Sequence, residues 1–310
     1  IALFCNVKKK GVIEAIDVDN IYEIPMLLQN QNFDVMVMGM LGLDRTDEPD
    51  LREWEDYLRR SKSPSKRAEI ALVGKYVGHK DAYLSVNEAI EHAAVNNDAK
   101  VCVRYIEAEE VERLGVDTLK GVDAILVPGG FGRRGIEGKI MAARYARENL
   151  IPYFGLCLGM QIAVIEFARN VCSIASAHSS EFDPGTPNPV IHLLEEQKDI
   201  SKIGGSMRLG SYPCEIKTNT LAYKAYGLST VYERHRHRWE FNNDYRNRLE
   251  KEGLIVSGVC LDGNLVEIVE LKDHPWFVGV QFHPEFKSRP TRPHPLFASF
   301  IEAAIRHSQG

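Results

Sequence analysis

The sequence lacks the features that mark several classes of protein. No apolar run approaches the roughly 20 residues needed to cross a bilayer, and the N-terminus lacks the order of charged, apolar and small residues found in a signal peptide. The six cysteines are scattered without a CxxC pair, so neither a zinc site nor a redox motif is indicated. The net charge of -5 gives no general attraction to nucleic acid or to an anionic membrane. We therefore expect a cytoplasmic protein with reduced thiols and with no metal site, nucleic acid partner or membrane partner.

The chain of 310 residues is long enough for one large α/β domain, or for one domain and a piece of another. It begins in an apolar, strand-like run without a starting Met, which indicates a truncated chain. Strand and helix signals alternate over residues 1–43, where GVIEAIDV precedes a helical run around Tyr22–Leu28. Residues 44–67 are charged and contain prolines, and we expect an interdomain linker with one short helix around Leu51–Arg60. Residues 68–310 are expected to form a separate domain.

Strand and helix signals alternate regularly from Glu69 onward. EIALVGKYV, KVCVRYI, DAILVPGG and IPYFGL are typical of strands, and the helical runs AYLSVNEAIEHAAV, GKIMAARYARE and LGMQIAVIEFAR lie among them. Such alternation predicts a parallel sheet with helices on both faces. After about residue 205 the pattern changes to strands separated by turn signals, before a final helix at Pro295–Arg306. The predicted fold class is α/β, with a mainly parallel central sheet flanked by helices and additional antiparallel strands in the C-terminal part.

One cysteine lies between two glycines, in the run Gly155-Leu156-Cys157-Leu158-Gly159, where an apolar strand turns into a helix. A G-x-C-x-G sequence at such a junction is typical of a nucleophile elbow, in which small residues permit a tight turn and the reactive side chain projects from the carboxyl edge of the sheet. The helix N-terminus also favours the thiolate, which is the form of cysteine that attacks a carbonyl. Taken alone, the elbow fits a buried structural cysteine equally well.

The run VQFHPEF, residues 280–286, contains the partners that a nucleophilic thiol needs. His283 and Glu285 are two residues apart at the end of a strand, so their side chains can project from one face. A thiol needs a base, and the base needs an acidic partner that fixes its tautomer. His-Pro-Glu alone is more often an exposed loop. Combined with the elbow in an α/β frame, it predicts a catalytic triad of Cys157, His283 and Glu285.

A glycine-rich segment, PGGFG at residues 128–132, follows the strand DAILV. Glycines let backbone N–H donors approach an oxyanion, and the amides of Gly130 and Leu158 are the candidate donors. The same segment satisfies GxGxxG over residues 130–135, so a Rossmann phosphate loop is a rival interpretation. No acidic residue clearly ends a strand about 20 residues further on, as that motif requires. A Walker A motif is also missed, because Ile140 replaces Ser or Thr.

PGGFG, GLCLGMQ and QFHPE, in this order, resemble the motifs of class I glutamine amidotransferase domains. Further stretches resemble the glutaminase part of the CTP synthase family, namely GKYVGHKDAYLSVNEA, SSEFDP, GGSMRLG, ERHRHRWEFNN and DHPWFVGVQFHPEF. Residues 1–43 are similar to the tail of that family's N-terminal synthetase (amidoligase) domain. The resemblance covers essentially the whole chain and implies a class I amidotransferase domain over residues 68–310.

The resemblance implies a role for each matching residue. Cys157 is the nucleophile that forms a γ-glutamyl thioester, His283 is the general base and acid, and Glu285 orients His283. L-Glutamine offers an ammonium group to Glu181 and a carboxylate to Arg238. Without the resemblance, Glu181 fits a helix or turn cap and Arg238 fits a solvated strand face. The implied glutamine-binding residues are Gly130, Leu158, Gly159, Met160, Gln161, Glu181 and Arg238.

The resemblance also implies an effector and nucleotides. GTP is the family's allosteric activator, and its candidate contacts are Lys75, Phe131 and Arg208. Asp17 and Val18 are candidate contacts of ATP. Each of these residues also fits an exposed charge, a loop anchor or a turn. The implied reaction is the ATP-dependent amination of UTP to CTP in pyrimidine biosynthesis, by a homotetramer. Mg, ATP and UTP are expected to bind mainly in synthetase sequence that this chain lacks, so no cofactor is expected in the chain itself.

Two other functions stay open on the residues alone. A γ-glutamyl hydrolase or a cysteine peptidase on a similar frame would keep the triad and change the substrate. A non-catalytic nucleotide-binding module would make Cys157 a structural residue. The residues implied to hold the two ends of glutamine, Glu181 and Arg238, favour the glutaminase.

Overall fold

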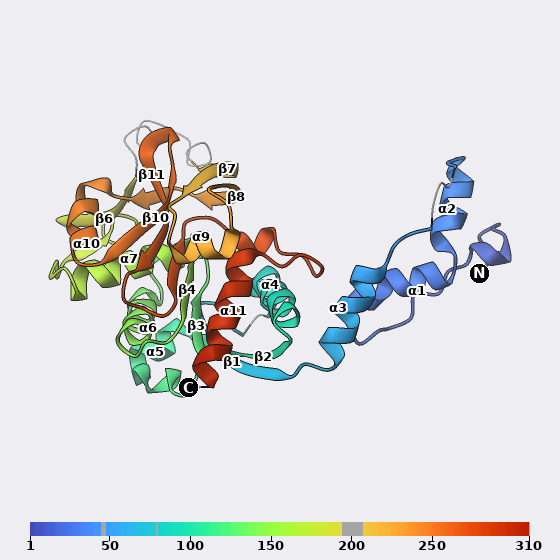
Figure 1. Ribbon diagram of the computed structural model, residues 1–310, viewed down its shortest axis with the longest axis horizontal. Helices are drawn as coiled ribbons and strands as arrows, with labels where there is room; N and C mark the ends of the chain where they lie inside the picture. The colour runs from blue at the N-terminus through green and yellow to red at the C-terminus, as the bar shows by residue number, and fades with distance from the viewer. Residues whose placement is uncertain (45–47, 79, 194–206, 310) are drawn as a thin grey trace. The chain divides into compact units, whose positions relative to one another are not determined.

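The computed structural model describes residues 1–44, 48–78, 80–193 and 207–309 (Figure 1). The chain forms two compact units, Ile1–Ser63 and Pro64–Gly310. The boundary between the units falls inside the predicted linker, while the assignment of three separate segments stays a prediction. Among the described residues, no helix is both long and apolar enough to cross a membrane.

The first unit consists of short helices, and an aromatic cluster joins two of its segments. The ring centroid of Tyr22 lies 5.8 Å from that of Trp54 and 5.3 Å from that of Tyr57, both on its last helix. The helices predicted around residues 22–28 and 51–60 are confirmed. The helices are α1 (Ile24–Asn30), α2 (Phe33–Leu41) and α3 (Arg52–Lys62), with 3-10 turns at Lys9–Gly11 and Ile21–Glu23.

The strand signals near the N-terminus do not produce strands, so this part of the prediction is wrong. Residues 1–7 and 11–18 form turns and unpaired extended segments, and no strand occurs among the described residues of the first unit. Leu3, Phe4 and Ile16 are 87%, 93% and 56% exposed. An apolar run becomes a strand when a neighbouring strand takes up its backbone N–H and C=O groups. Neither run has such a neighbour in this unit.

The second unit contains one sheet of nine strands in the order β2-β1-β3-β4-β12-β11-β10-β7-β8 and a second sheet in the order β5-β6-β9 (Figure 1). In the large sheet, pairs from β2 to β12 are parallel and pairs from β12 to β8 are antiparallel. The predicted fold class is therefore confirmed. The strands of the large sheet are β1 (Lys66–Gly74), β2 (Ala99–Glu107), β3 (Ala124–Val127), β4 (Tyr153–Leu156), β7 (Arg208–Ile216), β8 (Thr230–His237), β10 (Leu254–Cys260), β11 (Leu265–Leu271) and β12 (Phe277–Val280). The small sheet contains β5 (Ala177–Ser179), β6 (Asn188–Leu193) and β9 (Trp239–Phe241).

Helices cover both faces of the large sheet. Successive residues of a strand point to opposite sides, so they pack against different helices. Ala71 and Val73 of β1 lie in one buried cluster with α5, α6, α7 and α10, whereas Ile70 and Leu72 lie in another with α4, α9 and α11. The α-helices are α4 (Leu84–Asn96), α5 (Ala108–Leu114), α6 (Ile136–Glu148), α7 (Leu158–Asn170), α9 (Leu221–Tyr226), α10 (Arg246–Lys251) and α11 (Pro295–Ser308). Short 3-10 turns occur at Lys80–Tyr83, Val116–Leu119, Asn243–Tyr245, Asp262–Asn264 and Pro284–Phe286.

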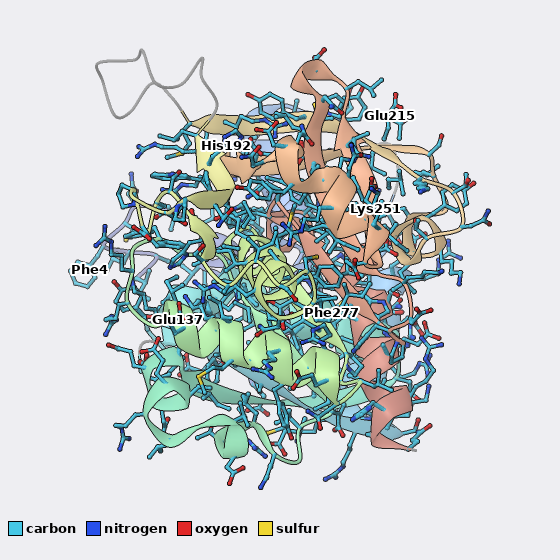
Figure 2. The ribbon with its side chains drawn as sticks, turned by 90° about the vertical axis from the view of Figure 1, so that its left-hand side faces the viewer. Phe4, Glu137, His192, Glu215, Lys251 and Phe277 are labelled. Atoms are coloured by element: carbon cyan, nitrogen blue, oxygen red, sulfur yellow. The ribbon has the colours of Figure 1, made fainter. Side chains whose placement is uncertain are left out.

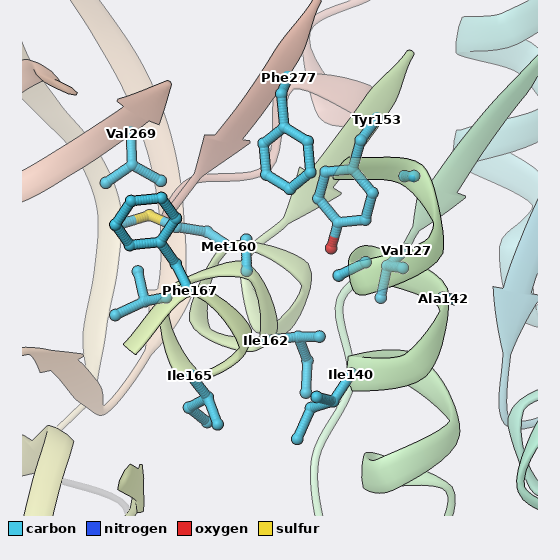
Figure 3. Packing of buried hydrophobic residues seen from close by; sticks show 14 of the residues in the cluster. Val127, Ile140, Ala142, Tyr153, Met160, Ile162, Ile165, Phe167, Val269 and Phe277 are labelled. Carbon is cyan, nitrogen blue, oxygen red and sulfur yellow. The ribbon is translucent and has the colours of Figure 1, made fainter. Parts of the chain in front are cut away.

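The packing around α7 makes the central part of this unit rigid. Tyr153 of β4 stacks on Phe277 of β12 with ring centroids 4.3 Å apart (Figure 3). The Tyr153 hydroxyl donates to the carbonyl of Gly159 on α7 at 2.8 Å, which joins strand and helix in the core. Phe277 is 2% exposed. The charged side chains labelled in Figure 2 lie in contrast at the exposed surface of this unit, namely Glu137, Glu215 and Lys251.

One continuous strand-like run of the sequence, STVYERHRHRWEF, is divided between the two sheets. The run at residues 229–241 leaves the large sheet after His237 at the end of β8 and enters the small sheet with Trp239 at the start of β9. Arg238 lies at this junction. The elements that the sequence patterns did not indicate are short or lie in irregular regions, where periodicity is weak, namely α5, α9, α10, β5 and β6.

The carboxyl ends of four parallel strands meet at one edge of the large sheet. These strands are β1, β3, β4 and β12, and parallel neighbours end at the same edge of a sheet. Segments far apart in the sequence are thereby brought together. The residues that follow the four strands are Lys75, Pro128, Cys157 and Gln281.

Candidate functional site

Cys157 is the single residue between β4 and α7. Its backbone has φ 49° and ψ -97°, a positive φ that is uncommon for a residue other than glycine and is typical of strained functional turns. Its N–H donates to the Val280 carbonyl at the end of β12 at 2.7 Å, which ties the turn to the neighbouring strand. This backbone is that of a nucleophile elbow.

Gly155 and Gly159 are required by close packing of the backbone around this turn. A Cβ on Gly155 would lie 2.5 Å from the carbonyl of Gly159, and a Cβ on Gly159 would lie 2.2 Å from the carbonyl oxygen of Val127 on β3. Neither position accepts a side chain unless α7 moves away from the sheet. The two glycines flanking Cys157 therefore allow α7 to start against β4 and β3.

His283 and Glu285 form a hydrogen-bonded pair just after β12. The Nδ1 atom of His283 lies 2.7 Å from Oε1 of Glu285, and both side chains are about 8% exposed. The His283 N–H donates to the Arg234 carbonyl of β8 at 2.8 Å, and its ring stacks on Phe286 with centroids 5.2 Å apart. These contacts hold the imidazole in one orientation, with Nε2 directed away from the carboxylate.

The glycine loop brings His283 and Cys157 together. A Cβ on Gly129 would lie 2.9 Å from Cε1 of His283 and 3.6 Å from Cβ of Cys157. His283 Nε2 is buried and has no hydrogen-bond partner among the residues that the structure describes. Burial lowers the pKa of His283, but Cys157 and Glu285 outweigh burial and raise the pKa from 6.5 to about 10. Cys157 and Glu285 therefore favour the charged form of the imidazole.

Titration of His283 is expected to depend on Cys157. In the unchanged chain the midpoint should lie near 10, because Cys157 and Glu285 raise the pKa. In Cys157→Ala the midpoint should fall, since burial remains while one partner is lost. The pairing stabilises the fold fully below pH 6.5, and this contribution is lost as the pH rises through about 10.

Side-chain NMR of the imidazole Cε1–H measures this midpoint directly. His92 is a suitable internal control, because burial lowers its pKa to about 4 against the opposing effect of Glu88. Its midpoint should be the same in both proteins. An unchanged midpoint for His283 in Cys157→Ala would show that the thiol does not influence the imidazole.

A cavity of about 1070 Å³ opens at this edge of the sheet. Leu158 and Met160 do not line it, since their side chains are buried in the core at 1% and 0% exposure. The amide groups of Leu158 and Gly159 open α7, where the first N–H groups of a helix have no partner within the helix. Of the predicted site residues, those that line the cavity are Gly130, Phe131, Cys157, Gln161, Glu181, Arg238, His283 and Glu285.

Glu181 and Arg238 place opposite charges on the wall of this cavity. Oε1 of Glu181 accepts a hydrogen bond from the Gly132 N–H at 3.1 Å, so the carboxylate is held against the glycine loop. Burial raises the pKa of Glu181, although the Gly132 amide, Lys75, Arg238 and Lys139 act in the opposite direction. The Nε atom of Arg238 is buried without a partner among the described residues. Both groups have hydrogen-bonding capacity left for a ligand.

The candidate effector residues occupy two different environments. Nζ of Lys75 donates to the Phe131 carbonyl at 2.7 Å and lies 5.7 Å from the centroid of that ring, which is 72% exposed. Arg208 is buried instead, and its guanidinium pairs with Glu267 at 2.8 Å and with Glu240 at 3.3 Å. Burial opposes the charge of Arg208, but the two carboxylates raise its pKa. Arg208 does not line the cavity, so its position favours a structural role.

Two predictions about ligands are not settled by these contacts. Asp17 and Val18 lie in the first unit, and their contact with ATP stays a prediction. Among the described residues, no group of three or more His, Cys, Asp and Glu side chains is arranged to hold a metal ion.

Gln281 is a site residue that the sequence reasoning missed. Its Nε2 lies 3.7 Å from Sγ of Cys157, and its side chain is 0% exposed. The signal was present, because Gln281 directly follows β12 as Cys157 directly follows β4. Only the pairing of these two strands brings the residues into contact.

Comparison with known families is consistent with this geometry. The family model of glutamine amidotransferase class-I matches residues 79–303, and that of the CTP synthase N-terminus matches residues 1–43. The chain therefore belongs to the class-I glutamine amidotransferase family. Within that family its relatives are CTP synthases, as the resemblance of its motifs implied.

Individual relatives support the narrower relationship. The chain is 56% identical to CTP synthase of Bacillus velezensis over 310 residues, which is 100% of this chain and 58% of the relative. It is 58% identical to CTP synthase of Caldanaerobacter subterraneus over 306 residues, which is 98% of this chain and 57% of the relative. It thus spans little more than half the length of these relatives.

A solved structure matches the second part of the chain. This is the glutaminase domain of Trypanosoma brucei CTPS with bound acivicin, which is 40% identical with a TM-score of 0.72. The match covers 77% of this chain and 94% of that domain. The α/β unit therefore has the fold of a CTP synthase glutaminase domain.

Proposed function

We propose that this chain hydrolyses the side-chain amide of L-glutamine and supplies ammonia for the ATP-dependent amination of UTP to CTP. The observation that carries the proposal is that Cys157, His283 and Glu285 share one cavity with Glu181 and Arg238. Three of these residues provide covalent chemistry, and two provide charges that match the ends of an amino acid. A glutaminase needs both sets in one place.

The triad accounts for each proton and bond of the hydrolysis. Sγ of Cys157 attacks the amide carbon, and His283 holds the thiol proton and transfers it to the departing ammonia. Water, deprotonated by His283, then cleaves the thioester to glutamate and restores the thiol. Glu285 holds Nδ1 of His283 at 2.7 Å, which keeps Nε2 available for these transfers.

The oxyanion of the tetrahedral intermediate forms next to backbone N–H groups. The amide of Leu158 opens α7 directly after Cys157, and its N–H has no acceptor within the helix. Gly130 contributes the second amide from the loop that follows β3. A Cβ on Gly130 would lie 3.4 Å from the Leu158 side chain, so the two backbone segments are close. Preorganised donors of this kind stabilise the charge that develops in the transition state.

Two charged side chains on the wall of the cavity, Glu181 and Arg238, recognise glutamine. Glu181 pairs with the α-ammonium, and Arg238 holds the α-carboxylate through its guanidinium. Gly159, Met160 and Gln161 contribute through the first turn of α7. Gln161 is the member of this turn whose side chain reaches the cavity.

The proposal also includes the binding of nucleotides and the oligomeric state of the enzyme. ATP, UTP and Mg bind mainly to synthetase sequence beyond this chain, and Asp17 and Val18 contribute to the ATP site. GTP activates the glutaminase by contact with Lys75 and Phe131, next to the mouth of the cavity. The enzyme acts as a homotetramer.

Two alternative functions are less consistent with these contacts. A phosphate loop at residues 130–135 would need its amides, but Glu181 already accepts from the Gly132 N–H, and a carboxylate there repels phosphate. A peptidase has no use for charges placed to bind both the α-ammonium and the α-carboxylate of one amino acid. Glutamine hydrolysis is therefore the favoured function.

Arg238→Ala tests this function through its dependence on the α-carboxylate. The unchanged chain should release ammonia from L-glutamine, as measured in a coupled glutamate dehydrogenase assay. The variant should raise KM by about 100-fold, because a charged hydrogen-bonding partner of the substrate is lost. Alkylation of Cys157 by iodoacetamide, followed by mass spectrometry, should be unchanged, since that reagent has no carboxylate.

A control variant and two contrary outcomes complete this test. Arg236→Ala is the matched control, because Arg236 also lines the cavity but has no role in the proposal. Equal loss of glutamine turnover and of Cys157 alkylation in Arg238→Ala would assign Arg238 a structural role. Release of the C-terminal residue from γ-glutamyl peptides, without ammonia from free glutamine, would contradict the glutaminase.

A further inference from the structure

The buried amide groups of two glutamines connect the wall of the cavity with the nucleophile. Gln161 on α7 is 3% exposed and Gln281 after β12 is 0% exposed. Nε2 of Gln161 donates to the Trp239 carbonyl at 2.9 Å and to Oε1 of Gln281 at 3.3 Å. Nε2 of Gln281 in turn lies 3.7 Å from Sγ of Cys157. The contacts form a continuous chain from the start of β9 to the reacting sulfur.

The direction of this chain of hydrogen bonds is determined by its first member. The Trp239 carbonyl can only accept a hydrogen bond, so the atom of Gln161 that faces it must be the amide nitrogen. The second hydrogen of that nitrogen points to Gln281, whose facing atom must therefore be the carbonyl oxygen. The NH₂ group of Gln281 is then left facing Cys157. Exchanging the O and N atoms of either amide would place two acceptors or two donors against each other.

We infer that Gln281 is a further residue of the catalytic site, whose amide N–H donates to the Cys157 sulfur and stabilises the thiolate, with Gln161 as the residue that positions it. The inference rests on the proposed role of Cys157 as the nucleophile. The sulfur is then stabilised from two sides, by the charge of the nearby His283 imidazolium and by the hydrogen bond from the Gln281 amide. Both lower the free energy of the charged sulfur relative to the thiol.

Burial makes this donor effective. Gln281 is excluded from water, so no solvent acceptor competes with the sulfur for its N–H. Its backbone is fixed as well, since the Gln281 N–H donates to the Glu267 carbonyl of β11 at 2.8 Å. The amide therefore faces the sulfur before any substrate binds.

The pH dependence of Cys157 alkylation tests this hydrogen bond. In Gln281→Met, a side chain of similar length without a donor, the midpoint for alkylation by iodoacetamide should rise by about one pH unit, because a hydrogen bond to a charged group is worth roughly one to two pKa units. The rate on the alkaline plateau should stay equal or rise, since a more basic thiolate is the stronger nucleophile. Mass spectrometry of the Cys157 peptide gives the rate for this thiol alone.

The plateau separates loss of a donor from damage to the site. A misplaced thiol would react more slowly at every pH, whereas loss of the donor moves the midpoint and keeps the plateau. The other charged or titratable groups facing this cavity, apart from the His283–Glu285 pair, are unchanged in the variant, namely Asp81, Tyr83, Arg133, Glu181, Arg236, His237 and Arg238.

Two further proteins complete the design. Ser299→Ala removes one hydrogen-bond acceptor, that of the Trp276 indole at 2.9 Å, far from the thiol in the fold, and should leave the midpoint unchanged. Gln281→Glu keeps the shape of the side chain and its acceptor for Gln161, but places a carboxylate against the sulfur. Its midpoint should rise further than in Gln281→Met, because charge repulsion adds to the loss of the donor. If Gln281→Met does not fold, the Gln281 NH₂ resonance of the unchanged chain decides the matter.

The result is independent of glutamine turnover. If the chain releases no ammonia from glutamine, the proposed function fails, while the midpoint still reports the hydrogen bond because iodoacetamide needs no glutamine. An unchanged midpoint in a folded Gln281→Met or Gln281→Glu protein overturns the inference. In the unchanged chain, the Gln281 side-chain NH₂ resonance should move with the ionisation of Cys157, and a resonance that does not move overturns it as well.

Discussion

Cys157→Ala is expected to abolish glutamine hydrolysis, with turnover reduced by about 10⁴-fold or more. The reason is that Cys157 is the one thiol among the described residues that line the cavity, and hydrolysis then depends on binding and on the oxyanion amides. The measurement is ammonia release from L-glutamine with matched concentrations of folded protein, and circular dichroism checks that the fold is kept. His283→Ala should be similarly damaging, whereas Glu285→Ala should cost less, because it orients the base without exchanging a proton with substrate.

Cys172→Ala is the matched control for the loss of a thiol. Cys172 is 6% exposed like Cys157, but burial raises the pKa of its thiol to about 11, and it does not line the cavity. Its replacement should leave turnover per folded molecule unchanged. Glutamine turnover that persists in folded Cys157→Ala would remove the nucleophile from the proposal, and with it the thioester.

Gly159→Ala is expected to have the largest effect on stability, with a loss of about 4 kcal/mol or more in the free energy of unfolding. Its Cβ would lie 2.2 Å from the carbonyl oxygen of Val127, which is backbone of the buried strand β3 and cannot rotate away. Relief requires α7 to shift against the sheet, and the packing of Tyr153 on α7 would be lost with it. Urea unfolding followed by circular dichroism measures the change.

Gly185→Ala is the corresponding control in the same unit. A Cβ there would meet only the Asp183 side chain at 3.6 Å, which is ordinary van der Waals contact, and the residue is exposed. Its stability should stay within about 0.5 kcal/mol of the unchanged chain, as for most surface substitutions. Equal stability of Gly159→Ala and Gly185→Ala would mean that the start of α7 is not held against β3 as described.

The parts of the site that could be predicted are those defined by neighbours in the sequence. The turn at Cys157 was predictable, because Gly155 and Gly159 permit an approach of backbone to backbone that any other residue would block. The His283–Glu285 pair was predictable because the two residues are near neighbours in the sequence, although a 3-10 turn at Pro284–Phe286 after β12 brings them together, and not the shared face of a strand. Apart from α5, the order of the strands and α-helices between residues 69 and 170 followed from periodicity over whole segments.

Other features depended on contacts with residues far away in the sequence, which no local sequence pattern indicates. The apolar runs at residues 1–7 and 11–18 suggested strands, but a strand needs a neighbour, and the first unit provides none among its described residues. Arg208 was a candidate GTP contact that also fitted an exposed charge or a loop anchor, and the structure shows it buried beside Glu240 and Glu267, which come from other strands. In both cases the surroundings of the side chains depended on distant parts of the chain and could not be inferred from the sequence.

By itself, the sequence determined which reactive groups this protein carries, because a thiol at a glycine-flanked turn, a histidine with its acid and a glycine loop each occupy a few consecutive residues. Only the tertiary structure decided how these pieces meet. The pairing of β4 with β12 places Cys157 beside Gln281, which is 124 residues away in the chain, and the break after His237 places Arg238 on the cavity wall. The physical reason is that hydrogen bonds and charges act through distance in space, and spatial distance is set by which strands are neighbours in the sheet.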